Sequence, residues 1–226
     1  MALLCADEIA RRSDLTRSDT TRNDPLRYDP KRSFFTGDHM KVCRATIESI
    51  SPYSASRKHA EEKGAKESHA DFEQRTWREK AHYTEDGHVL IPPESFSFAI
   101  KAMASRLRIR IPGKGQSEYG KLFTAGILIT EGLVCKETRD SVASFTGSMN
   151  ADGKRGSGKR VDRTFPVVPK WGGVLEIYIL DDEIPKDVFE RVLHECGKLN
   201  GVGRYRPAQG GTNGRFKVTK FEWSEQ

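Results

Sequence analysis

The sequence lacks a long apolar run and a leader-like first segment. None of its apolar stretches approaches the ~20 residues that a membrane-spanning helix needs, so we expect no membrane partner. The first residues, MALLCADEIARRSD, contain only a short apolar stretch with no basic residues before it, which argues against a secretory signal. We therefore expect a cytoplasmic protein.

Cysteines are also few and scattered. The chain has four, at Cys5, Cys43, Cys135 and Cys196. They form no C-x-x-C pair and have no spacing typical of a zinc site. We expect reduced, mostly buried thiols, and neither a metal ion nor another cofactor.

Charge of neither sign dominates, although the balance is mildly basic. Lys and Arg number 38 against 32 Asp and Glu, which gives a net charge of +6. This excess favours a polyanionic partner without establishing one. The 226 residues, 36% of them hydrophobic, predict one soluble globular domain with a modest core and insertions.

Residues 1–40 lack the periodic apolar residues of a folded element. Arginines and aspartates alternate there instead, so the segment cannot bury enough surface to offset its ordering entropy. We predict a disordered or loosely attached tail over 1–40, followed by a single domain over 41–226 with insertions at about 55–85 and 136–170. Met40 opens a strand-like run and is a second candidate, beside Met1, for the first residue of the natural protein.

Apolar periodicity in the rest of the chain predicts two strand–helix–strand units. The expected strands lie at 41–50, 87–93, 121–135 (two short strands), 173–180 and 217–223, and the expected helices at 93–107 and 185–200. Such a pattern favours an α+β fold with a ferredoxin-like or RRM-like core, in which an antiparallel sheet carries the helices on one face. The other face would be free for a ligand.

The segment 201–216, GVGRYRPAQGGTNGRF, is here named the glycine–arginine loop. Glycine lets a backbone approach a ligand closely, arginine grips phosphate in a bidentate manner, and aromatic rings stack on bases. These are the needs of a groove for single-stranded nucleic acid; solvated arginines on an ordinary turn are the alternative. Its candidate binding residues are Gly201, Gly203, Arg204, Tyr205, Arg206, Gly210, Gly211, Gly214 and Arg215.

A second glycine-rich basic loop is predicted at 146–163. Its candidates for phosphate contact are Lys154, Arg155, Lys159, Arg160 and Arg163. Its stretch GKRGSGKR nearly matches a P-loop, but Arg160 occupies the place of the magnesium-binding Ser or Thr and an extended segment follows, so we do not expect ATP binding. A merely solvated loop is again the alternative.

Three segments resemble the RAMP superfamily, which supplies backbone and processing subunits of CRISPR effector complexes. They are the serine–proline turn IESISPYS at 47–54, the strand–helix junction VLIPPESFSFAIKAMASRL at 89–107, and the glycine–arginine loop. The resemblance spans 41–223 and implies an RRM-like protein that binds single-stranded RNA, with a thumb hairpin inserted at 136–170. It also implies other copies of the chain, or CRISPR-type subunits, as partners. The short chain and its middle insertion depart from the pattern and leave a phage or mobile-element relative open.

The leading hypothesis is a non-catalytic subunit that holds the backbone of a single-stranded RNA guide, with single-stranded DNA as the other possible ligand. One alternative is a metal-independent endoribonuclease on the same fold, with His59, His69 and Asp71 as candidates for acid–base catalysis. Histidines in a charged segment are more often bystanders. Another alternative is a phage-encoded interaction protein that mimics or inhibits a CRISPR subunit.

Overall fold

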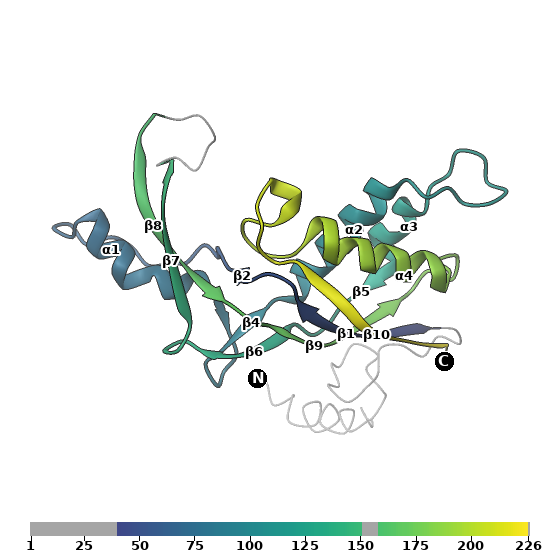
Figure 1. Cartoon of the computed structure of the whole chain (residues 1–226), viewed down its shortest axis with the longest axis horizontal. Coiled ribbons are helices and arrows are strands. Elements are labelled where there is room, and N and C mark those ends of the chain that lie inside the picture. Colours follow the sequence, from purple (N-terminus) through teal and green to yellow (C-terminus); the bar gives the residue numbers. More distant parts are fainter. Residues whose placement is uncertain (1–39, 151–157, 226) are drawn as a thin grey trace, which may run out of the picture. The chain divides into compact units, whose positions relative to one another are not determined.

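The computed structural model describes residues 40–150 and 158–225, and its elements follow the order of two interlocked β-α-β units (Figure 1). The tail predicted at 1–40 lies outside the described residues except for Met40. Within the part of the chain that is described, no helix is both long enough and apolar enough to cross a membrane.

The central sheet has four antiparallel strands in the order β10–β1–β9–β5. They are β1 (Lys41–Ser49), β5 (Ile127–Leu128), β9 (Gly172–Ile179) and β10 (Phe216–Glu225). β1 pairs with β9 on one side and with β10 on the other, while β5 pairs with the far side of β9. With one helical crossover between β1 and β5 and another between β9 and β10, this is the ferredoxin-like topology. The predicted α+β class and ferredoxin-like core are therefore confirmed.

Helices α2 (Pro93–Leu107) and α4 (Lys186–Glu195) supply the two crossovers and pack against each other. The predicted helix at 93–107 is confirmed, with Pro93 in its first turn, where a missing N–H costs little. Its apolar stripe is buried in the same core as the inward residues of β1 and β9, so the helices cover one face of the sheet (Figure 1).

The second predicted helix is confirmed with an altered last turn. α4 ends at Glu195 and continues as the π-helical η2 (Cys196–Asn200). Gly201 then takes a positive φ of 66°, and its N–H donates to the carbonyl of Cys196 at 2.9 Å. This ending directs the chain into the glycine–arginine loop.

The strand expected at 121–135 is wrong in its first half, which forms helix α3 (Tyr119–Gly126). Buried Phe123 explains the difference, because its ring stacks on Phe189 of α4 at 5.8 Å and needs the helical spacing to reach it. The second half is strand as expected: β5 comes first and then β6 (Leu133–Thr138).

β6 belongs to a second sheet of order β3–β4–β6, together with β3 (His82–Tyr83) and β4 (His88–Ile91). The strand predicted at 87–93 is thus confirmed as β4. β4 pairs antiparallel with both of its neighbours and leads directly into α2.

The basic loop predicted at 146–163 is largely a hairpin. Strands β7 (Ala143–Asn150) and β8 (Arg160–Val168) pair antiparallel, and β8 also pairs with the short β2 (Tyr53–Ser54). Residues 151–157, at the end of the hairpin, lie outside the described residues. A hairpin within 136–170 is where the resemblance to RAMP proteins implies a thumb.

The charged insertion at 55–85 forms helix α1 (His69–Thr76) and the 3₁₀ helix η1 (Trp77–Lys80). Both helices pack against β8. The insertion therefore supports the hairpin at its base.

Replacing Phe96 with alanine tests this assignment of the α2 faces. Phe96 is fully buried, with its ring 6.5 Å from that of Trp171 and 6.2 Å from that of Phe216. Phe96→Ala should lower the free energy of unfolding by about 3–5 kcal/mol. Phe98→Ala, in the same helix, is the matched control: Phe98 is 70% exposed, and its loss should change stability by less than about 0.5 kcal/mol. Urea denaturation measures both, and equal losses would contradict the assignment.

Candidate nucleic-acid interface

The glycine–arginine loop is fixed to the segment that follows β1. The N–H of Arg204 donates to the carbonyl of Ser54, and the N–H of Gly214 donates to the carbonyl of Pro52, both at 2.7 Å. The loop is also closed on itself, because Val202 N–H donates to Gly214 at 3.0 Å. Its shape is therefore set by the fold rather than by a ligand.

Most glycines of the loop are required by the chain's own packing. Gly214 has a φ of 74°, and a Cβ there would lie 1.8 Å from the carbonyl oxygen of Val202. At Gly203 a Cβ would lie 2.5 Å from the ring of Tyr53. At Gly211 a Cβ would lie 1.9 Å from the carbonyl oxygen of Tyr205, and at Gly201 it would lie 2.9 Å from that of Gly214. Packing within the chain therefore explains why glycine occupies these four positions. A close approach of the backbone to a ligand is not needed to explain them.

The two predicted basic segments meet at one cavity, here named the hairpin groove. It has a volume of about 920 Å³ and lies between the β7–β8 hairpin and the glycine–arginine loop. Arg160 and Arg163 come from β8, whereas Arg204, Tyr205 and Gly210 come from the loop. All five were candidates from the sequence. The remaining lining residues are Ser56, Ser148, Met149, Asn150, Phe165, Ala208 and Gln209.

Arg204 joins the loop to the hairpin. Its guanidinium carbon lies 3.4 Å from the ring centre of Phe165 in β8 and 4.1 Å from that of Tyr205. Its Nη2 also contacts Sδ of Met149 in β7 at 2.6 Å. Burial lowers the pKa of Arg204, and the neighbouring charge of Arg163 lowers it further, while Tyr205 raises it.

The Nη1 group of Arg204 is buried and has no hydrogen-bond partner among residues 40–150 and 158–225. A buried N–H without an acceptor is costly, and the fold tolerates that cost at this position. Arg204 also lines the hairpin groove, where the positive charge of its guanidinium would attract a phosphate.

A largely buried ion pair between Lys80 and Glu73 contacts Phe165 and the backbone of Thr164. The Nζ of Lys80 bonds Oε1 of Glu73, donates to the carbonyl of Thr164 at 2.8 Å, and lies 4.4 Å from the ring centre of Phe165. The N–H of Thr164 donates to the same Glu73 oxygen at 2.7 Å. Burial lowers the pKa of Lys80, and Glu73 opposes that shift. The insertion at 55–85 thereby positions the strand that carries Phe165 and Arg163.

A second cavity of about 490 Å³, here named the helix pocket, adjoins the hairpin groove. Arg204, Ser56 and Gln209 line both cavities. The helix pocket also contains Gly203 and Arg206 of the glycine–arginine loop. Its other lining residues are Tyr53, Ala55, Arg57, His82, Pro92, Ser95, Phe98, Ala99, Ala102, Asn200 and Val202.

The two cavities together form a cationic surface. Their linings include five arginines and, among the described residues, no aspartate or glutamate. The whole chain, by contrast, has 32 acidic residues against 38 basic ones. The arginines are Arg57, Arg160, Arg163, Arg204 and Arg206.

Other predicted binding residues lie elsewhere. Lys154 and Arg155 fall outside the described residues. Lys159 is exposed but lines neither cavity, within the part of the chain that the structure describes. Arg215 donates to the carbonyls of Lys198 and Thr212, at 3.2 and 3.4 Å, and so braces the loop.

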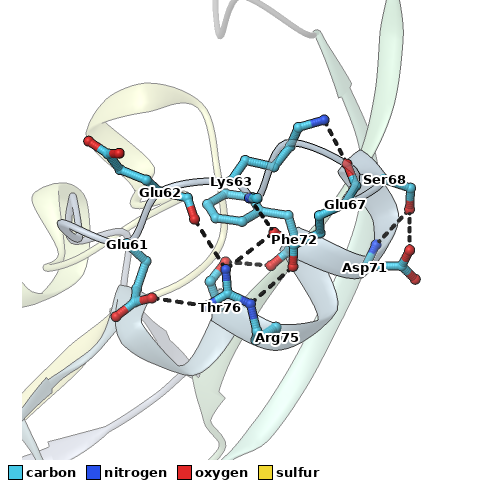
Figure 2. Close-up of polar contacts among 10 residues, drawn as sticks. Glu61, Glu62, Lys63, Glu67, Ser68, Asp71, Phe72, Arg75 and Thr76 are labelled. Carbon is cyan, nitrogen blue, oxygen red and sulfur yellow. Dashed lines mark hydrogen bonds and ion pairs between the residues drawn. The ribbon is translucent and has the colours of Figure 1, made fainter.

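The three catalytic candidates are not brought to the cavities. Asp71 accepts a hydrogen bond from the Ser68 hydroxyl at the start of α1 (Figure 2). The His59 ring packs 5.9 Å from that of Phe72, and His69 is exposed. Across the described ranges, no group of three or more His, Cys, Asp or Glu is arranged to hold a metal ion.

Arg75 of α1 is neutralised by the segment that precedes the helix. It pairs with Glu61 at 2.9 Å and with Glu67 at 3.0 Å (Figure 2). Such exposed pairs contribute little to stability. The insertion therefore presents no strong cationic surface of its own at this point.

The open face of the central sheet carries mixed charge rather than an aromatic platform. Arg44 pairs with Glu176 at 2.6 Å, and the Tyr178 hydroxyl donates to the same carboxylate. These contacts lower the pKa of Glu176, with the hydrogen bond from Tyr178 as the largest cause. The expectation that bases lie across this face gains no support from these side chains.

Two aromatic residues of the interface were not predicted from the sequence. Phe165 follows Arg163 by two residues, so alternation along β8 puts both on the same face. Phe98 falls outside the apolar stripe of α2 that includes Phe96 and Ile100. Its place in the helix could therefore have indicated from the sequence that its ring is exposed.

No protein-family model and no curated protein matches the chain. Among solved structures, the chain is similar to one from the Type III-B Cmr-beta complex bound to cognate target RNA, at 12% identity and a TM-score of 0.49. That match covers 82% of this chain and 61% of the other, so this chain spans about three fifths of its length.

Two further solved structures show a weaker likeness. Cmr6 from Pyrococcus furiosus has 11% identity and a TM-score of 0.41, with 79% of this chain and 98% of the other covered. A chain of a CRISPR RNA-guided surveillance complex has 8% identity and a TM-score of 0.33, with 76% and 65% covered.

Replacing Lys80 with methionine tests whether the buried pair supports the hairpin. Lys80→Met leaves the largely buried Glu73 carboxylate without its cation, and should lower the free energy of unfolding by about 1–3 kcal/mol. Amide hydrogen exchange in β8 should accelerate. Lys217→Met is the matched control, since its pair with Glu48 is exposed on both sides and should contribute little. Equal stability and equal exchange in the two variants would refute a supporting role for Lys80.

Proposed function

We propose that this protein is a non-catalytic subunit of a CRISPR-type ribonucleoprotein, and that it holds the backbone of single-stranded RNA in the hairpin groove. The observation that carries the proposal is the meeting of two basic segments, distant in sequence, around adjoining cavities whose described linings contain five arginines and no carboxylate. Grooves of this kind bind single strands through phosphate contacts and aromatic stacking.

The arginines and aromatics of the groove have complementary roles. Arg160 and Arg163 bind phosphates from the hairpin side, and Arg204 adds positive charge from the loop side. Tyr205 is 42% exposed beside Arg204 and offers a ring on which a base stacks. A strand in the groove thus contacts both walls.

Assignment to a CRISPR-type assembly rests on the resemblance of three sequence segments to RAMP proteins. Single-stranded DNA is the other ligand that this surface accommodates, because phosphate contacts and stacking do not read the sugar. The endoribonuclease alternative gains no support from His59, His69 and Asp71, because none of them lines the groove or the pocket.

Removing two groove arginines tests the proposal. Arg160→Ala/Arg163→Ala should weaken binding to a 20-nucleotide RNA by about ten- to a hundredfold, because two charge-assisted contacts are lost. The slope of log affinity against log salt should flatten by about 1.4, from about 0.7 for each phosphate contact. Fluorescence anisotropy between about 50 and 200 mM salt measures both quantities, with a DNA strand of the same sequence measured in parallel.

A control of equal charge separates local contact from net charge. Arg106 and Lys121 are exposed on α2 and α3 and line neither cavity. Arg106→Ala/Lys121→Ala should therefore bind nearly as the unmodified protein does. Equal weakening in both double variants would contradict a binding site in the groove. Absence of any nucleic-acid binding at low salt would favour the interaction or inhibitor alternative instead.

A further inference from the structure

The helix pocket contains an aromatic ring that the fold does not use. Phe98 lies in the middle of α2, yet it is 70% exposed, while Phe96 and Ala99 of the same helix are buried. Its ring is therefore part of the pocket lining and contributes little to the core. An exposed Phe inside a cavity is a favourable surface for a planar ligand.

The lining of the pocket also contains polar side chains. Ser95 lies one helical turn before Phe98, and His82 of β3 and Arg57 line the same cavity. Burial lowers the pKa of His82, and the charge of Arg57 lowers it further, although Glu94 partly opposes both. A neutral imidazole has one donor and one acceptor, and so matches the polar edge of a heterocycle.

The pocket adjoins the hairpin groove and shares lining residues with it. Arg204 lines both cavities, as do Ser56 and Gln209. Arg206 is part of the pocket lining beyond Arg204. A strand whose phosphates lie along Arg163 and Arg204 thus brings its next nucleotide to the mouth of the pocket.

We propose that the helix pocket binds one nucleobase of the single strand held in the hairpin groove, with the base stacked on Phe98 and its polar edge toward His82 and Ser95. This inference rests on the proposed function. A nucleobase is favoured over a protein side chain because the pocket adjoins the proposed phosphate-binding groove, and because the described lining of both cavities is cationic without a carboxylate. Arg206 then neutralises the phosphate of the inserted nucleotide.

The test combines a protein variant with a ligand that has no bases. The affinities of the unmodified full chain and of Phe98→Ala are measured for a 12-nucleotide RNA and for an abasic strand of equal length and charge. Phe98→Ala should weaken RNA binding by about 5- to 100-fold, the range expected for the loss of one stacked base. It should leave binding of the abasic strand and the salt dependence unchanged, because no cation is removed.

Two variants complete the comparison. Phe98→Trp retains a stacking surface and should keep most of the RNA affinity, whereas Val174→Ala removes an exposed apolar side chain that lines neither cavity and should change nothing. Undiminished RNA binding by Phe98→Ala, while Arg160→Ala/Arg163→Ala binds weakly, would overturn the inference and leave the proposed function standing.

Two other outcomes also count against the inference. Equal losses of Phe98→Ala on RNA and on the abasic strand would show that the ring acts through the fold rather than on a base. Failure of the unmodified protein to bind either strand would overturn the proposed function, and this inference with it.

Discussion

The contact between the Arg204 guanidinium and the Phe165 ring is the interaction on which the interface depends. It is the point at which a loop from the C-terminal part of the fold meets a hairpin inserted before β9. A cation over an aromatic face contributes about 0.5–2 kcal/mol, which is modest as stability. Its larger effect is geometric, since it ties the loop side of the hairpin groove to the hairpin side.

This contact is supported in turn by the charged insertion. Lys80 and Glu73 hold the backbone of Thr164, and Lys80 also lies near the Phe165 ring. An insertion that departs from the RAMP-like pattern in sequence is therefore integrated with the interface in structure. On its exposed side, Arg75 is paired with Glu61 and Glu67. On its buried side, Lys80 and Glu73 position strand β8 of the hairpin.

The sequence predicted those elements whose apolar residues have a clear period. Helix α2 was predicted to the residue because its stripe is long and begins at a proline, and β1, β9 and β10 alternate well enough to be recognised. α3 was missed because a short apolar run has no decisive period, and only its packing on Phe189 selects the helix. The residues of 146–163 alone predict a loop, because glycine and charge conceal the strand pairing, whereas the resemblance to RAMP proteins implies a hairpin within 136–170.

For the interface, sequence reasoning identified the arginines but not their neighbours. That Arg163 and Arg204 lie at one groove depends on tertiary contacts that no local pattern encodes. Phe165 and Phe98 were missed because an aromatic residue is usually assigned to the core. The glycines were recognised as special, although most of them are needed where the chain crosses itself and not where a ligand approaches.

The attachment of the glycine–arginine loop to Pro52 and Ser54 has a consequence for protein synthesis. The two sides of the contact lie far apart in the sequence, so it cannot form until the glycine–arginine loop has left the ribosome. A nascent chain thus has arginine-rich segments but no assembled groove. Capture of a strand between the two walls is then a property of the finished protein, and an incomplete translation product cannot compete for the same ligand in that way.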